Sequence, residues 1–410
     1  MLIRLLIKFI MLWSLLYSIG SNANQQSAAQ FIETLKQGSL YQRQGFYLDA
    51  HTTYLSAYQQ AIQSGTEREQ ALAQTALAYS EYLLNNPAKA EPLLQHALQY
   101  AQTNQDYGLL ALNQYYLGQL QLSQNQIQTA QTLLQQSLKN AQLIPDLLLI
   151  SRIHIALAQS SRQLKDLQHH RQQALQTLKT VEQSSDTIEL YLLLTEQGLQ
   201  NAPFPKLLNK SDSPAGKQAA SQHLNDLYQL LQRVNQHREL ANPRQQAKYH
   251  ALTAQLYASQ DRDTEALYLT QQAIQRLQTE QAQDLLMLYE WQAGRLHANL
   301  QNTDLAIKSY RRAVSYLQEI RQDIPVIYHN GKSSFLELFG PLYREMIELL
   351  LQQSANTVAL PSKHQLLHEA RTIMERLKQT ELEDFFKDRC LLGDIDTDHL
   401  AIKQTNVAVL

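Results

Sequence analysis

MLYEWQAGRLHANLQNTDLAIKSYRRAVSYLQEI, residues 287–320, decides the fold of this chain. Two helical patterns flank a short polar break at Gln301-Asn302-Thr303. The first contains the small pair Ala293-Gly294, where a partner helix can come close. The second pattern has alanine or tyrosine at positions i, i+4 and i+7, which lie along one stripe of a helix. The residues of that stripe are Ala306, Tyr310 and Ala313. The stretch predicts two helices packed as a hairpin.

The second-helix stripe recurs at a fixed interval, from position 50 to 90 to 130 and again from 266 to 306. Its copies are Ala50/Tyr54/Ala57, Ala90/Leu94/Ala97, Ala130/Leu134/Ser137, Ala266/Thr270/Ala273 and Ala306/Tyr310/Ala313. A small residue precedes each copy by twelve positions, at Gly38, Ala78, Gly118, Ala254 and Gly294. Because one helical hairpin cannot bury its apolar face alone, this period predicts a stack of neighbouring hairpins.

The pattern G-x-x-H followed by A-x-x-x-Y-x-x-A resembles the tetratricopeptide repeat. The resemblance implies an all-α fold, a right-handed α-solenoid of tetratricopeptide type with a C-terminal helical extension. The usual period of such repeats, about 34 residues, is shorter than the interval found here, so we expect each helix to be extended by about a turn. HEAT and armadillo arrays, with periods of about 40 to 47, are the alternative.

The array is predicted over residues 24–320 as about seven repeats, degenerate at 151–240. His170 stands where the period places an alanine. The segment NAPFPKLLNKSDSPAGK, residues 201–217, is rich in turn-forming residues and predicts a loop or long connection. We expect one degenerate repeat around it, with helices near 187–199 and 218–234.

The N-terminus has the pattern of a secretory signal peptide, predicted over residues 1–23. Arg4 and Lys8 precede an apolar run at 9–19, and small residues precede a cleavage site after Ala23. The pattern predicts an exported protein, periplasmic or secreted. An uncleaved N-terminal membrane anchor is the alternative. The sequence offers no second candidate span, so no membrane association is expected after cleavage.

The composition argues against nucleic acid as a partner. The 410 residues carry a formal net charge of −2, and no run of basic residues supplies the electrostatic attraction that phosphates require. Cys390 is the only cysteine and therefore cannot form an internal disulfide.

Beyond residue 320 the repeat pattern stops and capping signals appear. Ser334 to Glu337 has the spacing of a capping box, and Pro341 is expected in the first turn of the helix that follows. A second such box at Ser362 to Gln365 predicts the start of another helix.

This region resembles the segment that joins the repeats to a caspase-like peptidase in bacterial TPR–CHAT proteins. The resemblance rests on residues 320–324, 333–337, 341–343, 370–371, 377–378, 381–386, Asp388 and Cys390. It implies a helical joining segment over 321–392 and a tail, 393–410, similar to the start of a missing CHAT domain. In the family the peptidase carries a His–Cys dyad, and no residue here matches either motif. We therefore expect no enzyme activity; the alternative is a truncated N-terminal part of a CHAT-domain cysteine peptidase.

Other chemistry-bearing residues have simpler interpretations. We expect Cys390 to be a structural thiol, as it is in the joining segment that it resembles. His364 and His368 have the i, i+4 spacing of a zinc pair, but Gln365 stands where a metalloprotease needs glutamate. His169 and His170 are adjacent and should point to different sides of a helix. We expect no metal and no cofactor.

The remaining candidate is an interaction surface. In tetratricopeptide arrays the second, fifth, ninth and twelfth positions of each first helix line the inner groove. The resemblance thus implies a peptide-binding groove formed by Tyr79, Tyr82, Tyr115, Gln119, Arg152, Gln159, Arg162, Lys248, Gln255, Trp291 and Arg295. Tyrosine, tryptophan and arginine often anchor interfaces, although some of these residues could instead pack against the next repeat. The sequence therefore predicts a scaffold that binds a protein or peptide in its concave groove, with partner identity and oligomeric state left open.

Overall fold

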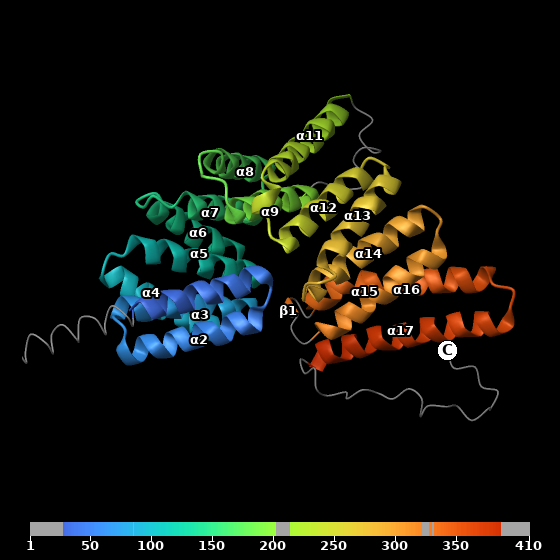
Figure 1. The fold of residues 1–410 in the computed structure, drawn as a ribbon, viewed down its shortest axis with the longest axis horizontal. Helices are drawn as coiled ribbons and strands as arrows, with labels where there is room; N and C mark the ends of the chain where they lie inside the picture. Colours follow the sequence, from blue (N-terminus) through green and yellow to red (C-terminus); the bar gives the residue numbers. More distant parts are fainter. Residues whose placement is uncertain (1–27, 85, 202–213, 322–327, 330–331, 387–410) are drawn as a thin grey trace, which may run out of the picture. The chain divides into compact units, whose positions relative to one another are not determined.

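The computed structural model describes residues 28–84, 86–201, 214–321, 328–329 and 332–386 (Figure 1). The chain divides into a first unit, up to Pro325, and a second unit from Val326. The predicted signal peptide, Cys390 and the tail at 393–410 lie outside the described residues.

The described part of the first unit is a succession of helix pairs (Figure 1). The pairs are helix 28–44 with α2 (Tyr47–Ser64), α3 (Glu67–Leu83) with α4 (Pro87–Thr103), α5 (Tyr107–Ser123) with α6 (Ile127–Ala141), α7 (Leu147–Ser160) with α8 (Leu164–Leu178), α9 (Ser185–Asn201) with α11 (Pro214–Gln236), α12 (Pro243–Ala258) with α13 (Asp263–Leu277), and α14 (Gln283–Asn299) with α15 (Thr303–Glu319). A short 3-10 helix, Arg238–Leu240, precedes α12. The predicted all-α, tetratricopeptide-like fold is confirmed.

Helix length explains the long period of the repeat. The helices α3 and α4 each contain 17 residues, and a short turn follows each of them. Several turns of this kind place one residue in the left-handed region, at Gln105, Asn125, Asp261 and Gln301. Asp106 and Asp146 then accept the backbone N–H of the residue three positions on and cap the next first helix.

Small residues let the two helices of a pair approach. A Cβ added at Gly294 would lie 2.7 Å from the ring of Tyr310, and one at Gly118 would lie 2.8 Å from Leu134. A Cβ added at Gly38 would likewise lie 2.5 Å from the ring of Tyr54. The large partners are nearly fully buried. In three of the regular pairs a glycine thus faces a tyrosine or leucine, and Ala78 and Ala254 are the corresponding small residues of the other two.

The fourth pair departs from this rule, and the expectation for His170 is wrong. The helix α8 begins sooner after the start of α7 than α4 and α6 begin after the starts of their partners. The buried positions of α8 therefore lie earlier in the sequence than the repeat period predicts. Ala174 and Leu178 occupy two of them. Counted from the start of its helix, Arg171 occupies the position of Leu94 and Leu134, and His170 contacts His154 on α7.

The second unit contains the helices α16 (Ser334–Asn356) and α17 (Leu360–Phe386), which pack against each other. Two short strands, Tyr328–His329 and Lys332–Ser333, pair antiparallel before them. The helix α16 runs through Pro341, so the expectation that this proline marks a first turn is wrong. The helix α17 begins at Leu360, slightly before the predicted capping box.

Candidate functional site: a groove along the first helices

A groove of about 710 Å³ runs through the first unit. Its lining comes from helix 28–44, α2, α3, α5, α7, α9, α12 and α14. Every pair contributes its first helix, and among the second helices only α2, through Tyr47 and Tyr54, reaches the lining. Leucines such as Leu72, Leu112 and Leu190 alternate with polar side chains along the wall.

Part of the groove wall comes from a cluster of tyrosines, here called the tyrosine cluster: Tyr79, Tyr115 and Tyr116, which line the groove, and Tyr82, which lies beside them. The rings of Tyr79 and Tyr116 stack with centroids 4.2 Å apart, and Tyr82 also stacks on Tyr79, at 6.0 Å. Tyr115 lies 5.3 Å from Tyr116. Burial, followed by the neighbouring phenols, raises the pKa of Tyr79 well above its ordinary value. The phenols are thus neutral donors and acceptors on an aromatic surface.

Two arginines from opposite walls meet at one carboxylate beside the tyrosine cluster. Asp186, in the first turn of α9, lies 3.4 Å from Arg43 and 3.3 Å from Arg152. Burial disfavours the charged form of Arg152 and by itself would lower its pKa. The electrostatic effect of Tyr116, Tyr115 and Asp186 is larger, so the pKa of Arg152 is raised. Asp186 remains 27% exposed and Arg43 49% exposed, so solvent or a ligand can reach both groups.

Further along α9, one cation lies between two carboxylates. The ammonium of Lys248 is 2.9 Å from Glu196 and 3.5 Å from Glu189. Burial opposes the charge of Lys248, but the carboxylates prevail and raise its pKa. Both glutamates stay more than a third exposed. This cluster therefore has one more negative than positive charge.

The N-terminal pair closes the groove against α12. The guanidinium of Arg244 packs against the backbone of Gly45, where an added Cβ would lie 2.6 Å away, and pairs with Asp284. Gly45 has a φ of +84°, which side chains rarely adopt. A turn that only glycine fills easily thus allows residues far apart in the sequence to touch.

The groove brings together some of the residues that the sequence predicts. Tyr79, Tyr115, Arg152 and Lys248 line it. Tyr82 stacks on Tyr79, and Gln119 hydrogen-bonds with Tyr115, so both lie next to the lining.

The other predicted residues lie elsewhere. Gln159 is exposed near the end of α7, and Arg162 follows that helix. Gln255 donates to the side chain of Gln292, 3.1 Å away. Arg295 lies over the ring of Trp291 at 4.3 Å, which packs the two together. None of these five is among the residues that line the groove.

Sequence reasoning missed several lining residues, including Arg43, Tyr116, Asp186, Glu189 and Arg244. Asp186 and Glu189 lie on α9, whose repeat pattern is weak. The available signal was their spacing: Asp186, Glu189 and Glu196 recur at i, i+3 and i+10, one face of a helix.

Two histidines meet in the irregular fourth pair. The Nδ1 atoms of His154 and His170 are 3.2 Å apart, and His169 lies beside them. Burial, with repulsion from His170 and His169, lowers the pKa of His154 to about 4. Among the described residues no three metal-ligating side chains are grouped closely enough to hold an ion. His364 and His368 are exposed on α17.

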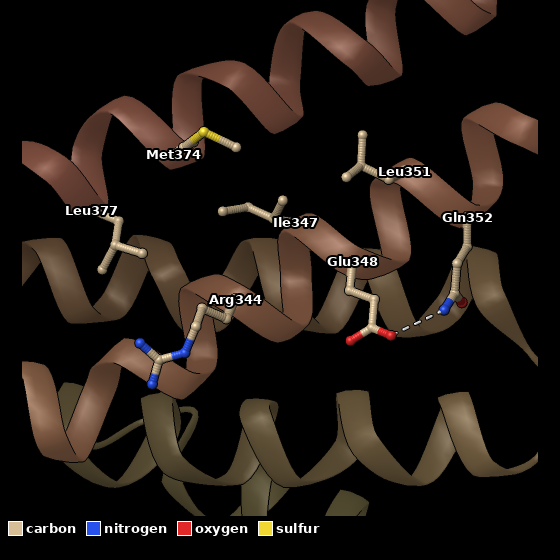
Figure 2. Close-up of a pocket in the computed structure, with 7 residues that line it drawn as sticks. All are labelled: Arg344, Ile347, Glu348, Leu351, Gln352, Met374 and Leu377. Carbon is tan, nitrogen blue, oxygen red and sulfur yellow. Dashed lines mark hydrogen bonds between the residues drawn. The ribbon is translucent and has the colours of Figure 1, made fainter. Parts of the chain in front are cut away.

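A second hollow lies on the second unit, between α16 and α17 (Figure 2). Ile347 and Leu351 face Met374 and Leu377, while Glu348 accepts a hydrogen bond from Gln352 at 3.3 Å. Nothing in the described residues shows what covers this apolar face. The groove of the first unit, with its directed polar groups, is the stronger candidate.

Comparisons with known proteins give only distant likenesses. Neither a protein-family model nor a curated protein matches the sequence. Among solved structures, a Rap protein complexed with competence and sporulation factor is 12% identical with a TM-score of 0.48, over 86% of this chain and 99% of that one. The apo form of RapI is 13% identical with a TM-score of 0.47, over 72% and 99%.

A signal transduction ATPase with a tetratricopeptide repeat sensor, from Pyrococcus horikoshii, is 13% identical with a TM-score of 0.49. This likeness covers 85% of the present chain and 49% of the ATPase. Identities this low say nothing about function.

Within the residues that the structure describes, no helix is both long and apolar enough to cross a membrane.

Proposed function

We propose that this protein is an interaction scaffold that binds an extended protein or peptide segment in the groove of the first unit. The observation that carries the proposal is the composition of the groove wall, in which a stacked tyrosine cluster lies next to half-exposed ion pairs. Tyrosine and arginine provide large contact areas with polar ends, and they dominate the energy of many interfaces.

The charge of the groove supports a protein partner over a nucleic acid. The cations Arg43, Arg152, Arg244 and Lys248 each lie in an ion pair. Phosphate backbones are bound through cations that replace condensed counterions, and paired cations cannot do this without losing their partners. A peptide, which carries few charges, needs no such excess.

The test selects peptides from a displayed random library for binding to the whole chain, after the peptides that also bind the Leu112→Arg variant have been removed. Leu112 lines the groove, and a long cation there would occupy it. Leu164→Arg, the same change at a leucine 67% exposed on α8, is the matched control. We expect peptides that bind the wild type and Leu164→Arg but not Leu112→Arg. Peptides that bind all three equally, or the absence of any enrichment, would refute the proposal.

Export is part of the same proposal and rests on the N-terminal signal pattern alone. Fractionation of the native cells, with the N-terminus of the mature chain read by mass spectrometry, tests it. A chain that begins at Asn24 or Gln25 in the exported fraction agrees with cleavage near Ala23. A chain that keeps residues 1–23 in the membrane fraction supports the anchor instead.

The resemblance of residues 320–390 supports a second proposal, that this chain corresponds to the N-terminal part of a TPR–CHAT protein. The intact mass of the native protein tests it. A species much heavier than the 47.0 kDa of this chain, with the same N-terminus, would support a peptidase domain in the natural product. A species of this mass or its signal-cleaved form would support a scaffold without one.

A further inference from the structure

Two neighbouring clusters along the helix α9 carry opposite local charge. At its first turn, the guanidinium groups of Arg43 and Arg152 share the single carboxylate of Asp186, which leaves one positive charge in excess. Further along the helix, the ammonium of Lys248 is shared by Glu189, which lines the groove, and Glu196, which lies beside the lining; this leaves one negative charge in excess. The groove is therefore electrically polar along α9.

The neighbouring charges do not cancel this polarity. Arg244 and Asp284 form a closed pair of net charge zero. The carboxylate of Asp146 accepts the backbone N–H of Leu149 at 2.9 Å and so caps α7. Asp146 adds a negative charge at the helix N-terminus, where the helix dipole, about half a positive charge, offsets it in part.

Each cluster can exchange part of its ion pairing for a ligand. Arg43 and Arg152 approach Asp186 at 3.4 and 3.3 Å, longer than close charge-assisted bonds of about 2.7–2.9 Å. A carboxylate from a ligand would give the second guanidinium its own partner. An ammonium or guanidinium from a ligand would do the same for the second glutamate beside Lys248.

We propose that the groove reads the order of charges in the segment it binds: an acidic group at Arg43 and Arg152, and a basic group at Glu189 and Glu196. This inference rests on the proposed binding function and names its ligand class. One excess positive charge matches a carboxylate better than a phosphate group, which carries about two negative charges at neutral pH. The tyrosine cluster beside Arg152 would hold the apolar residues next to the acid.

The helix α9 sets the distance between the two groups. Its residues rise about 1.5 Å each, so Glu189 and Glu196 lie about 5 and 15 Å along the axis from Asp186. An extended peptide covers about 3.3 Å per residue. The acid and the base of the ligand should therefore be separated by about two to five residues, in one direction only.

The test uses displayed random peptides, long enough to span both clusters, selected on the whole chain, on Arg152→Met and on Lys248→Met. Both substitutions replace a partly buried cation by an apolar chain of similar length, and circular dichroism verifies that each variant is folded. On the wild type we expect enrichment of peptides with an acid and a base at a fixed order and spacing. On Arg152→Met the preference for the acid should fall at least tenfold while that for the base persists.

Lys248→Met provides the opposite change, because it leaves two carboxylates without their cation. The preference for a base should rise there, whereas a purely structural lysine would leave it unchanged or abolish binding altogether. Peptides that depend on the groove, being lost on Leu112→Arg, but that show no charge order would overturn this inference and leave the proposed function intact. Peptides that do not depend on the groove would overturn both.

Discussion

The regular pairs of the first unit and its irregular middle differ in how their helices pack. In the regular pairs α5–α6 and α14–α15, the second helix starts the same number of residues after the start of the first. In both pairs a glycine faces a large side chain. In the pair α7–α8 the second helix starts sooner, two histidines face each other, and Arg171 occupies a leucine position. The middle thus gives up the packing rule that holds the rest.

The irregular part, around α7 and α9, supplies half of the charged residues that line the groove: Asp146, Arg152, Asp186 and Glu189. The other charged lining residues come from helix 28–44, α12 and α14, whereas α3 and α5 supply leucines and tyrosines at the groove wall. Polar groups at a partly buried position reduce stability unless they are paired, and the charged groups on α9 have partners. We infer that the regular repeats provide rigidity and the irregular ones provide specificity.

The largest effect should come from breaking a regular pair. Tyr310→Ala removes a ring that is 2% exposed and packs against Gly294, and such truncations cost about 3–5 kcal/mol. Chemical denaturation followed by circular dichroism measures the loss. Tyr268→Ala, at a tyrosine 62% exposed, is the control and should change the stability little. Equal losses in the two variants would contradict this packing rule.

The histidine pair of the irregular part should make stability depend on pH. The unfolded chain protonates His154 near pH 6.5, whereas burial lowers the pKa in the folded chain to about 4. Below pH 6.5 the unfolded state therefore binds more protons, and stability falls as the pH falls toward 4, by at most about 3 kcal/mol.

The unfolding free energies of wild type and His154→Gln at pH 7 and pH 4.5 test this dependence. The variant should lose less stability on acidification than the wild type. His364→Gln, at an exposed histidine of α17, controls for the removal of a histidine. An unchanged difference between the two pH values in His154→Gln would show that this pair does not carry the effect.

Closure of the groove should depend on Gly45. An alanine there would have to adopt a positive φ and would meet the guanidinium of Arg244, so Gly45→Ala should cost roughly 1–3 kcal/mol. In limited proteolysis, cleavage within residues 28–64 should be faster in Gly45→Ala than in the wild type. At Gly108, in a helix, an added Cβ would make only ordinary contact, so Gly108→Ala should be neutral or stabilising. Similar effects of the two changes would mean that the turn does not hold the N-terminal pair.

The smallest effect should come from making the irregular pair regular. Arg171 donates to the carbonyl of Leu194 at 3.1 Å, and its burial lowers its pKa. Arg171→Leu restores the residue found at positions 94 and 134, and it should change the stability by less than about 1 kcal/mol, in either direction. The reverse change, Leu134→Arg, should destabilise strongly. A large loss in Arg171→Leu would assign the arginine a structural role that leucine cannot fill.

Much of the fold could be predicted from the sequence because its packing is periodic. The stripes at Ala90/Leu94/Ala97 and Ala306/Tyr310/Ala313 fix which face each second helix buries, and their regular spacing fixes the stack. The shift in α8 could not be seen, because His170 and Ala174 fit two registers, and only the length of α7, 14 residues against 17 in α3 and α5, decides between them.

The groove was predicted only in part for a related reason. Tyr79 and Arg152 lie at family positions of first helices and do line it. Arg43 and Arg244 reach it because the chain curves until its first pair meets α12, and no local pattern encodes that contact. Trp291 and Arg295 satisfy each other instead, although their residue types suit an interface.

Photocrosslinking would test most directly whether the groove binds peptide. A benzophenone amino acid would replace Tyr116 in the tyrosine cluster or, in a control, Tyr268 on the exposed face of α13. The account predicts that a selected peptide becomes covalently attached from position 116 and not from position 268. Attachment from position 268 alone, or equally from both, would contradict it.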